Sequence, residues 1–306
     1  MELPKFAYFQ GDIIPFEEAR VSVLTHALNY GTAAFGGLRG YWNDQSEQLY
    51  IFRPYDHFHR LLQSAKLLRM SLDYTPESLT GITIKLLRTE DYRQDVYIRP
   101  LVYKADLGIG VRLHNLEDAL SIVALPFGLY VKQDTNAHVT ISSWRRVDDN
   151  AIPARGKISG AYVNSSLIKT DAAQSGFDEA LVLTQDGHVS EGSAMNVFIV
   201  RDGAIITPPV TENVLEGITR RSVITLAREV LDTPVIERPI DRTEVYICDE
   251  IFLTGTAAQI TAVTQVDHVP VGDGVMGPIT TQLRQLFTDV VRGRNPDFME
   301  WVTPVY

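Results

Sequence analysis

The chain alternates short apolar runs with stretches in which apolar residues recur at helical spacing. In one stretch the apolar positions follow an i, i+3, i+4, i+7, i+10 series: Phe58, Leu61, Leu62, Ala65 and Leu68. Residues spaced in this way lie on one face of a helix. Asp56 precedes the series and has a side chain that is favoured at a helix N-cap. The pattern therefore predicts an amphipathic helix capped by Asp56.

The same patterns predict the other elements. Helices are expected at 76–92, 159–175 and 217–231, and after Pro278, a residue type favoured in the first turn of a helix. Runs rich in Val, Ile, Leu and Tyr predict strands at 96–105, 119–131 and 139–147. A further strand that enters a glycine-containing turn is expected within 250–263, and residues 19–52 are expected to be rich in β-structure.

Two Asp-Gly pairs predict β-hairpins in the second half of the chain. Asp186-Gly187 and Asp202-Gly203 each separate two apolar runs. This dipeptide is a strong hairpin signal, because glycine accepts the positive φ that a tight turn requires. We therefore expect two antiparallel strand pairs at close spacing.

The alternation of strands and helices predicts an α/β or α+β fold, and 306 residues suggest about two domains. The segment 132–138 is polar and lacks a period, as is typical of a linker. We accordingly expect a small N-terminal domain at 1–123, an interdomain linker at 124–136 and a larger domain at 137–306.

Composition and charge exclude several classes of function. The 28 basic and 38 acidic residues give a net charge of −10, which disfavours binding to the phosphate backbone of nucleic acids. A single cysteine, Cys248, excludes a disulfide framework and a cysteine-based zinc site within one chain. The N-terminal segment lacks the pattern of a signal peptide, and no apolar run reaches the length of a membrane span. We expect a cytoplasmic protein that binds no membrane.

Two motifs are better explained as structure than as chemistry. Gly272, Gly274 and Gly277 spell G-x-G-x-x-G, but the pattern of a following parallel strand is missing, so a surface turn is expected rather than a dinucleotide site. His57 and His59 lie two apart within the predicted helix, where such residues do not share a face. No metal site is therefore expected.

Four other features are informative because of the order in which they occur along the chain. They are Lys157 among small residues, Glu191 after the first hairpin, the helix start at Gly217-Ile218-Thr219, and the turn at 254–257. Each has a plain alternative: a surface lysine, a solvated glutamate, an ordinary helix start and a β-turn. Together they supply a Schiff-base lysine, an acid for a pyridinium nitrogen, free N–H groups for a phosphate and donors for anionic oxygens. That combination points to pyridoxal phosphate.

Longer motifs give the chain a family resemblance. They include HALNYGTAAFGGLRGY, YIRPL, ALPFGLY, FDEALVLTQDGHVSEGSAMNVF, TPPVTENVLEGITR and FLTGTAAQITAV. From about Phe9 to Pro278 the chain resembles the class IV aminotransferases of fold type IV, and among them the branched-chain amino acid aminotransferases. The resemblance implies two α/β domains with the cofactor between them. It also implies a homodimer, or an assembly of dimers, in which the substrate site borrows a loop from the neighbouring subunit.

The resemblance assigns cofactor roles residue by residue. Lys157 would form the Schiff base and then act as the acid–base catalyst, while Glu191 would pair with the pyridine nitrogen. The phosphate would be held by Arg60, the amide of Ile218 next to Gly217, and the hydroxyls of Thr219 and Thr256. Tyr162 would contact the 3′-oxygen and Leu215 would pack on the ring. Without the family motifs, we would interpret Arg60 as a surface arginine, and Tyr162 and Leu215 as core residues.

Substrate roles follow in the same way. The residues implied in holding the α-carboxylate are Tyr97, Thr256 and Ala257. The residues implied in lining the side-chain pocket are Tyr30, Phe35, Gly37, Tyr130 and Tyr162. Arg39 and Arg99 would bind the second carboxylate of glutamate. Tyr97 and Arg99 are two apart on a predicted strand and so share a face. Without the family, Arg99 reads as one half of a cross-strand ion pair.

The implied reaction is ping-pong transamination of L-leucine, L-isoleucine or L-valine with 2-oxoglutarate, passing through the pyridoxamine phosphate form and serving branched-chain amino acid biosynthesis. Gly36 and Asn29 stand where many relatives have glutamate and histidine, and both lie beside the expected side-chain pocket. D-amino acid aminotransferase, (R)-amine transaminase and aminodeoxychorismate lyase are alternatives within the class. A non-catalytic relative that binds pyridoxal phosphate or a partner protein, and a dinucleotide oxidoreductase, are alternatives outside it.

Overall fold

The computed structural model describes residues 2–128 and 135–306, and its contacts group them into two compact units. The first unit contains residues 2–128, Gly156–Ala161 and Asp289–Tyr306. The second contains residues 135–155 and Tyr162–Thr288. The predicted division makes a single cut at 124–136, whereas the first unit also includes two later segments of the chain. The domain boundary stays a prediction.

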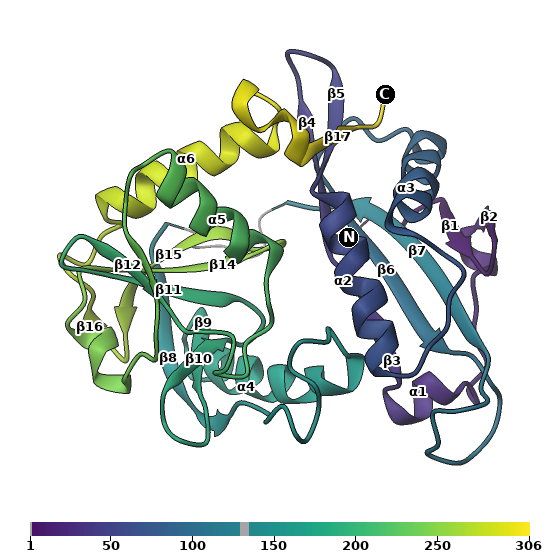
Figure 1. Ribbon diagram of the computed structural model, residues 1–306, viewed down its shortest axis with the longest axis horizontal. Coiled ribbons are helices and arrows are strands. Elements are labelled where there is room, and N and C mark those ends of the chain that lie inside the picture. Colours follow the sequence, from purple (N-terminus) through teal and green to yellow (C-terminus); the bar gives the residue numbers. More distant parts are fainter. Residues whose placement is uncertain (1, 129–134) are drawn as a thin grey trace. The chain divides into compact units, whose positions relative to one another are not determined.

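The first unit is built on an antiparallel sheet with the order β17-β5-β4-β6-β7-β1-β2, and β3 pairs with β6 (Figure 1). Its strands are β1 (Phe6–Phe9), β2 (Asp12–Pro15), β3 (Ala33–Phe35), β4 (Leu38–Asn43), β5 (Gln48–Phe52), β6 (Val96–Lys104), β7 (Asp118–Pro126) and β17 (Val302–Pro304). In β6 the buried Val96, Ile98 and Val102 alternate with the half-buried Tyr97 and the exposed Arg99. This two-residue period confirms that Tyr97 and Arg99 share a face.

Three α-helices accompany this sheet: α1 (His26–Tyr30), α2 (Pro54–Leu67) and α3 (Pro76–Glu90). The predicted N-cap of α2 was wrong. Arg53 caps the helix in a left-handed conformation and Pro54 occupies the first turn, where its fixed φ favours helix initiation. Asp56 lies in the first turn, and its carboxylate accepts a 2.7 Å hydrogen bond from Arg53 Nε.

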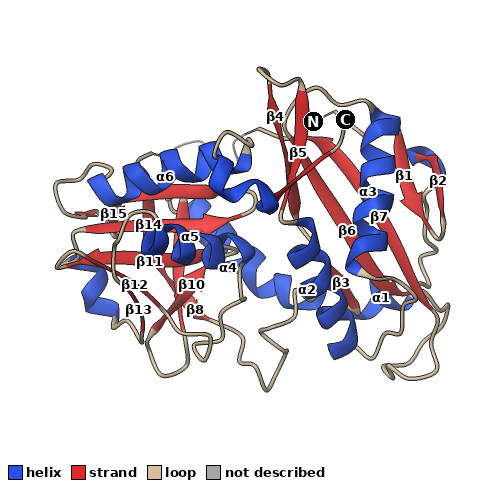
Figure 2. Cartoon of the chain, turned by 45° about the horizontal axis from the view of Figure 1, so that its top comes forward, coloured by secondary structure: helices blue, strands red, loops and turns tan. Residues whose placement is uncertain are grey.

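The second unit holds a mixed sheet with the order β10-β9-β8-β15-β14-β11-β12-β13, and β16 pairs with β15 (Figure 2). Its strands are β8 (Ala137–Arg145), β9 (Glu179–Leu183), β10 (Val189–Gly192), β11 (Asn196–Arg201), β12 (Ala204–Thr207), β13 (Val235–Glu237), β14 (Glu250–Gly255), β15 (Gln259–Val266) and β16 (Val269–Pro270). Both predicted hairpins are confirmed, as β9–β10 and β11–β12. Asp202 and Gly203 have φ values of 51° and 75°, as the tight turn requires.

The helices of this unit are α4 (Tyr162–Gln174), α5 (Ile218–Glu229) and α6 (Pro278–Val291). Helix α4 contacts β8 and β9, and α5 contacts β13 and β14. The carboxylate of Glu250 accepts hydrogen bonds from the amides of Ile279 and Thr280 at 2.9 and 2.8 Å, which satisfies free N–H groups in the first turn of α6. The core beneath the sheet is made of buried aliphatic residues such as Leu181, Val197 and Leu253.

Two short segments differ from their prediction, and a third confirms it. Residues 26–30, expected within a β-rich stretch, form α1, which ends at Gly31 with φ 66°. Ala137 and His138, expected in the linker segment 132–138, belong to β8, and 132–134 lie outside the described residues. The G-x-G-x-x-G segment forms a mostly exposed turn before α6, which confirms the structural interpretation.

A buried carboxylate in the second unit gives a pH-dependent contribution to stability. Glu244 accepts hydrogen bonds from Arg238 and Arg201, and these arginines hold the pKa of its carboxyl below the ordinary value of 4.5. Because the folded-state pKa is lowered, the stabilisation is complete above the ordinary value and is lost as pH falls through the folded value.

We therefore expect Glu244→Gln to lower the free energy of unfolding at about pH 7. In this variant the free energy of unfolding should also fall less steeply as the pH drops below about 4.5. Urea denaturation across this range measures both effects. The exposed Glu229, substituted in the same way, serves as the control. A Glu244→Gln profile parallel to that of the parent protein would contradict the expectation.

Candidate active site

The segment around Lys157 is fixed by two elements of the first unit. The amide of Phe35 in β3 donates to the carbonyl of Lys157 at 3.0 Å, and Ala34 forms an isolated β-bridge with Ile158. The amide of Lys157 donates to Ser64 Oγ at 3.1 Å, and Ser64 Oγ donates to the carbonyl of Arg60 at 2.8 Å. Ser64 is fully buried in α2. The backbone of Lys157 is therefore held from both sides.

The side chain of Lys157 lies beside the ring of Phe35, with Nζ 5.0 Å from the ring centroid. The guanidinium carbon of Arg99 lies 4.5 Å from the same centroid and 5.1 Å from that of Tyr97. Arg99 Nη2 also donates to the hydroxyl of Tyr97 at 3.2 Å. The structure thus places two predicted residues, Lys157 and Arg99, against the ring of a third, Phe35, and joins a fourth, Tyr97, to Arg99. Cations over aromatic faces are attracted by the ring quadrupole, which favours this arrangement.

Glycines allow close approaches around this group. A Cβ on Gly37 would lie 2.2 Å from the Tyr97 hydroxyl, so any other residue would displace that ring. A Cβ on Gly31 would lie 2.8 Å from the Cα of Gly160, whose amide donates to the Gly31 carbonyl at 3.1 Å. A Cβ on Gly36 would lie 2.6 Å from Pro100 Cγ. The space beside Gly36 is therefore filled by Pro100.

Arg39 differs from Arg99 in its surroundings. It is only 2% exposed, and its Nη2 donates to the carbonyls of Phe127 and Gly128, each at 3.0 Å. Asp95 lies 3.8 Å from the same nitrogen. These contacts fix the end of the segment after β7, and a role for Arg39 toward a substrate carboxylate stays a prediction. Tyr130 lies outside the described residues.

Two further predicted residues of the first unit are half-buried: Arg60, on α2, and Tyr30, at the end of α1. The Tyr30 hydroxyl accepts a 3.0 Å hydrogen bond from the amide of Gly110. Its ring lies 4.8 Å from that of His26, which itself contacts the carbonyl of Gly110 at 2.8 Å. These contacts join α1 to the loop that contains Gly110.

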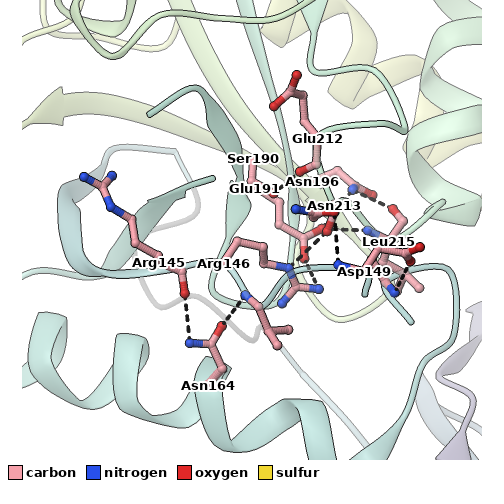
Figure 3. Close-up of polar contacts among 12 residues, drawn as sticks. Arg145, Arg146, Asp149, Asn164, Ser190, Glu191, Asn196, Glu212, Asn213 and Leu215 are labelled. Carbon is pink, nitrogen blue, oxygen red and sulfur yellow. Dashed lines mark hydrogen bonds and ion pairs between the residues drawn. The ribbon is translucent and has the colours of Figure 1, made fainter. Parts of the chain in front are cut away.

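In the second unit, Glu191 is the centre of a buried polar network (Figure 3). Its Oε1 lies 2.9 Å from Nη2 of Arg146. Its Oε2 accepts hydrogen bonds from the amide of Leu215 at 3.1 Å and from Asn196 Nδ2 at 3.3 Å. Asn196 Nδ2 also contacts the carbonyl of Leu215 at 2.8 Å. The structure therefore brings Glu191 and Leu215, two of the predicted cofactor residues, into direct contact.

The start of α5 is suited to an anion. Gly217 is its N-cap and makes no side-chain capping hydrogen bond, and Ile218 and Thr219 form the first turn. Unpaired N–H groups and the helix dipole favour negative charge at such an end. A Cβ on Gly217 would lie 2.1 Å from Asn196 Oδ1, so the chain at this point needs glycine. The cradle and its donors fit a phosphate group.

The remaining predicted residues lie at element ends in the second unit. Thr256 and Ala257 are half-buried in the turn between β14 and β15, where Gly255 pairs with Gln259. Tyr162 is the first residue of α4 and is also half-buried. Arg146, Asn196 and Ser64 were missed by sequence reasoning. No local pattern distinguishes Arg146 from its neighbour Arg145, although a polar residue inside the apolar run that forms β11 could have drawn notice to Asn196.

The sequence predicts neither a metal site nor a membrane span. Within residues 2–128 and 135–306, no group of three or more His, Cys, Asp or Glu side chains could hold a metal ion. His57 is buried while His59 is exposed and stacks on Tyr55, so the two histidines face different surroundings. Among the same described residues, no helix has the length and apolar character needed to cross a membrane.

Comparison with known proteins identifies the family. Residues 41–266 match the family described as amino-transferase class IV. The chain is 48% identical over 301 residues to a probable branched-chain-amino-acid aminotransferase of Aquifex aeolicus, covering 98% of this chain and 97% of the relative. This chain therefore belongs to the class IV aminotransferases, and the mixed α/β fold and the family predicted from the motifs are confirmed.

Solved structures agree with this assignment. The branched-chain amino acid aminotransferase from Thermobaculum terrenum in its PLP form is 42% identical, with a TM-score of 0.95 and full coverage of both chains. The branched-chain aminotransferase from the archaeon Thermoproteus uzoniensis, solved with norvaline, is 39% identical, with a TM-score of 0.95 and coverage of 99% of this chain and 100% of that one. These relatives, similar in sequence and in fold, carry the same activity in their names.

Proposed function

We propose that this chain is a pyridoxal phosphate-dependent aminotransferase that transfers the amino group of L-leucine, L-isoleucine or L-valine to 2-oxoglutarate. The bound cofactor would supply a carrier for the amino group between the two substrates, so we expect ping-pong kinetics. The observation that carries the proposal is the pair of residue groups around Lys157 and Glu191 in a chain of this family. The cytoplasmic location stays a prediction from the sequence.

The cofactor's phosphate would be held at the start of α5, by the Ile218 amide and the Thr219 and Thr256 hydroxyls, with Arg60 supplying charge. The support for this assignment is the uncapped helix start and the close approach of Gly217 to Asn196. When bound, pyridoxal phosphate supplies an electron sink that stabilises negative charge at the substrate's α-carbon.

Lys157 is the proposed Schiff-base lysine and the base that moves the proton at the α-carbon. Its fixed backbone leaves only the side chain to move, which limits where Nζ can reach. The Phe35 ring lies close to the amine and excludes water from that side. Glu191 is the proposed partner of the ring nitrogen; it and Lys157 act on the same cofactor under this proposal.

The two substrates differ in their side chains, and the proposal assigns each a contact. The apolar side chain of a branched amino acid would lie against Phe35 and the tyrosines predicted to wall the pocket. The second carboxylate of 2-oxoglutarate would pair with Arg99, whose guanidinium is exposed and oriented by Tyr97. An arginine held in this way binds a carboxylate in a defined direction.

A homodimer is part of the proposal. Apolar side chains are exposed on α1, on the segment before it and on the loop beyond β6: Val21, Val23, Leu24, Leu28, Leu107, Ile109 and Val111. Backbone contacts join these segments, since Gly108 donates to the Leu24 carbonyl at 3.2 Å and Thr25 forms a β-bridge with Leu107. Exposed apolar patches of this kind mark association surfaces. The patch reaches Gly110, which contacts Tyr30, and a second copy of the chain is its proposed occupant.

The central test separates the two half-reactions. Purified protein loaded with pyridoxal phosphate is mixed with L-leucine, D-alanine or (R)-1-phenylethylamine, and the cofactor's absorbance is recorded before and after 2-oxoglutarate is added. We expect L-leucine to convert the cofactor band and 2-oxoglutarate to restore it. Lys157→Ala is expected to lower turnover by roughly 10⁴-fold or more while cofactor remains bound through its phosphate.

Lys66→Ala, an exposed lysine of α2, is the matched control. Turnover retained in Lys157→Ala would remove the assignment of the catalytic lysine. Conversion by D-alanine alone, or by the (R)-amine, would move the protein to the corresponding alternative within the class.

Arg99→Gln tests the second-carboxylate contact. Loss of a charge-assisted pair costs about 1.5–3 kcal/mol, so the KM for 2-oxoglutarate should rise roughly 10- to 150-fold. The half-reaction with L-leucine, and that with the monocarboxylate 4-methyl-2-oxopentanoate, should change little. Arg93→Gln is the control, because Arg93 is also an exposed arginine over an aromatic ring. Equal losses with the mono- and dicarboxylate would refute the role of Arg99.

The assembly is tested by sedimentation equilibrium. The parent protein should sediment as a dimer or a multiple of it, and Ile109→Asp should shift it toward the monomer, because burying an unpaired charge opposes association. Val275→Asp, an exposed apolar position in the turn before α6, is the control. A parent protein that is monomeric at all concentrations would refute the homodimer.

A further inference from the structure

Arg146 is held in one position by contacts on its backbone and its side chain. It follows β8 directly, and its amide donates to the carbonyl of Leu183 at 2.8 Å. Asn164 on α4 contacts the backbone on both sides of it: Nδ2 donates to the carbonyl of Arg145 at 3.1 Å, and Oδ1 accepts from the amide of Val147 at 3.4 Å (Figure 3). Arg146 is 7% exposed. The guanidinium is thus presented from a fixed stretch of backbone.

The guanidinium has two different partners. Nη2 lies 2.9 Å from Oε1 of Glu191, and Nε donates to the carbonyl of Asn213 at 3.1 Å. Because the guanidinium is planar, binding through two of its nitrogens fixes its direction as well as its position. A lysine has a single nitrogen at its tip and could not reproduce both contacts. Arg146 therefore joins β10 to the segment that leads into α5.

The other oxygen of Glu191 accepts hydrogen bonds from two neutral donors, the Leu215 amide and Asn196 Nδ2. Every one of these partners is a donor, which suits an ionised carboxylate rather than a neutral one. A buried carboxylate loses the solvation that stabilises its charge in water. Arg146 carries the opposite charge and lies within ion-pair distance of this carboxylate.

We propose that Arg146 is a positioning residue for the transamination: its guanidinium keeps the buried Glu191 carboxylate ionised and fixed in direction, so that Glu191 can pair with the cofactor's ring nitrogen. This inference rests on the proposed function. Asn196 assists from the opposite oxygen, links the same carboxylate to Leu215, and lies close against Gly217, the N-cap of α5. The proposed partner of the ring nitrogen and the proposed phosphate cradle therefore share Asn196 as a neighbour.

A second arginine offers a matched comparison. Arg220 is also buried, lies 2.7 Å from a carboxylate oxygen of Glu237 and donates to the carbonyl of Pro208 at 2.9 Å. Both arginines therefore combine an ion pair with a carbonyl of the segment between β12 and α5. They differ in the carboxylate that they hold.

The first experiment measures the affinity for pyridoxal phosphate in Arg146→Met, Arg146→Lys, Glu191→Gln, the double variant Arg146→Met/Glu191→Gln, and Arg220→Met. We expect Arg146→Met to weaken binding roughly tenfold or more, which corresponds to about 1.4 kcal/mol, and Arg146→Lys to weaken it less. In the Glu191→Gln background, Arg146→Met should add little, because the charge on which it acts is gone. Arg220→Met should bind cofactor nearly as the parent does.

The second experiment requires no cofactor. Infrared difference spectra of the apoprotein, with ¹³C-labelled glutamate and with Glu191→Gln for assignment, follow protonation of the Glu191 carboxylate against pH. Removal of the neighbouring positive charge should raise the pH at which Glu191 takes up a proton in Arg146→Met. The lysine variant should restore most of the parent behaviour, and Arg220→Met should match the parent. If Arg146→Met does not fold, the lysine variant still reports a partial shift.

The outcomes separate this inference from the proposed function. Failure of the parent protein to bind pyridoxal phosphate would overturn the proposed function, and with it the catalytic purpose of Arg146, while the apoprotein spectra would still report whether Arg146 controls Glu191. Equal losses of affinity from Arg146→Met in the parent and Glu191→Gln backgrounds would overturn the positioning role. An unchanged Glu191 titration in Arg146→Met would do the same.

Discussion

Burial of a single negative charge, that of Glu191, governs the arrangement of the candidate site in the second unit. A carboxylate removed from water must be surrounded by donors, and three segments supply them to Glu191 on β10: the residue that follows β8, β11 and the segment before α5. The first unit follows a different rule, in which Lys157 and Arg99 lie against the Phe35 ring and main-chain bonds fix the lysine. One group is organised by charge pairing and the other by an aromatic surface.

Local signals predicted much of the fold. The Asp202-Gly203 turn and the apolar series from Phe58 to Leu68 depend on neighbours in sequence, and both formed as expected. The short helix α1 escaped prediction, because five residues are too few to show a helical period. The N-cap at Arg53 was missed because a left-handed arginine before proline carries no common capping signature.

Site residues that stand in sequence motifs could be predicted. Residues that only the fold brings together could not. Lys157 and Glu191 stand in recognisable segments, but the ion pair between Glu191 and Arg146 exists because β9 lies between β8 and β10 in the sheet. The spacing of residues along the sequence does not show how these strands are ordered in the sheet. The same holds for Arg39 and Arg99, which both read as carboxylate handles, whereas one is buried among carbonyls and the other is exposed.

The position of β17 has a consequence for how the protein is made. This strand, almost the last part of the chain, pairs with β5 at the edge of the first sheet, and the amide of Val305 donates to the Leu49 carbonyl at 2.9 Å. During synthesis on the ribosome, β5 emerges long before β17, because most of the second unit lies between them in the sequence. Until β17 follows, β5 keeps an unpaired edge, and unpaired edges are templates for association with other chains. The first sheet is therefore completed only after the strands of the second unit have been synthesised.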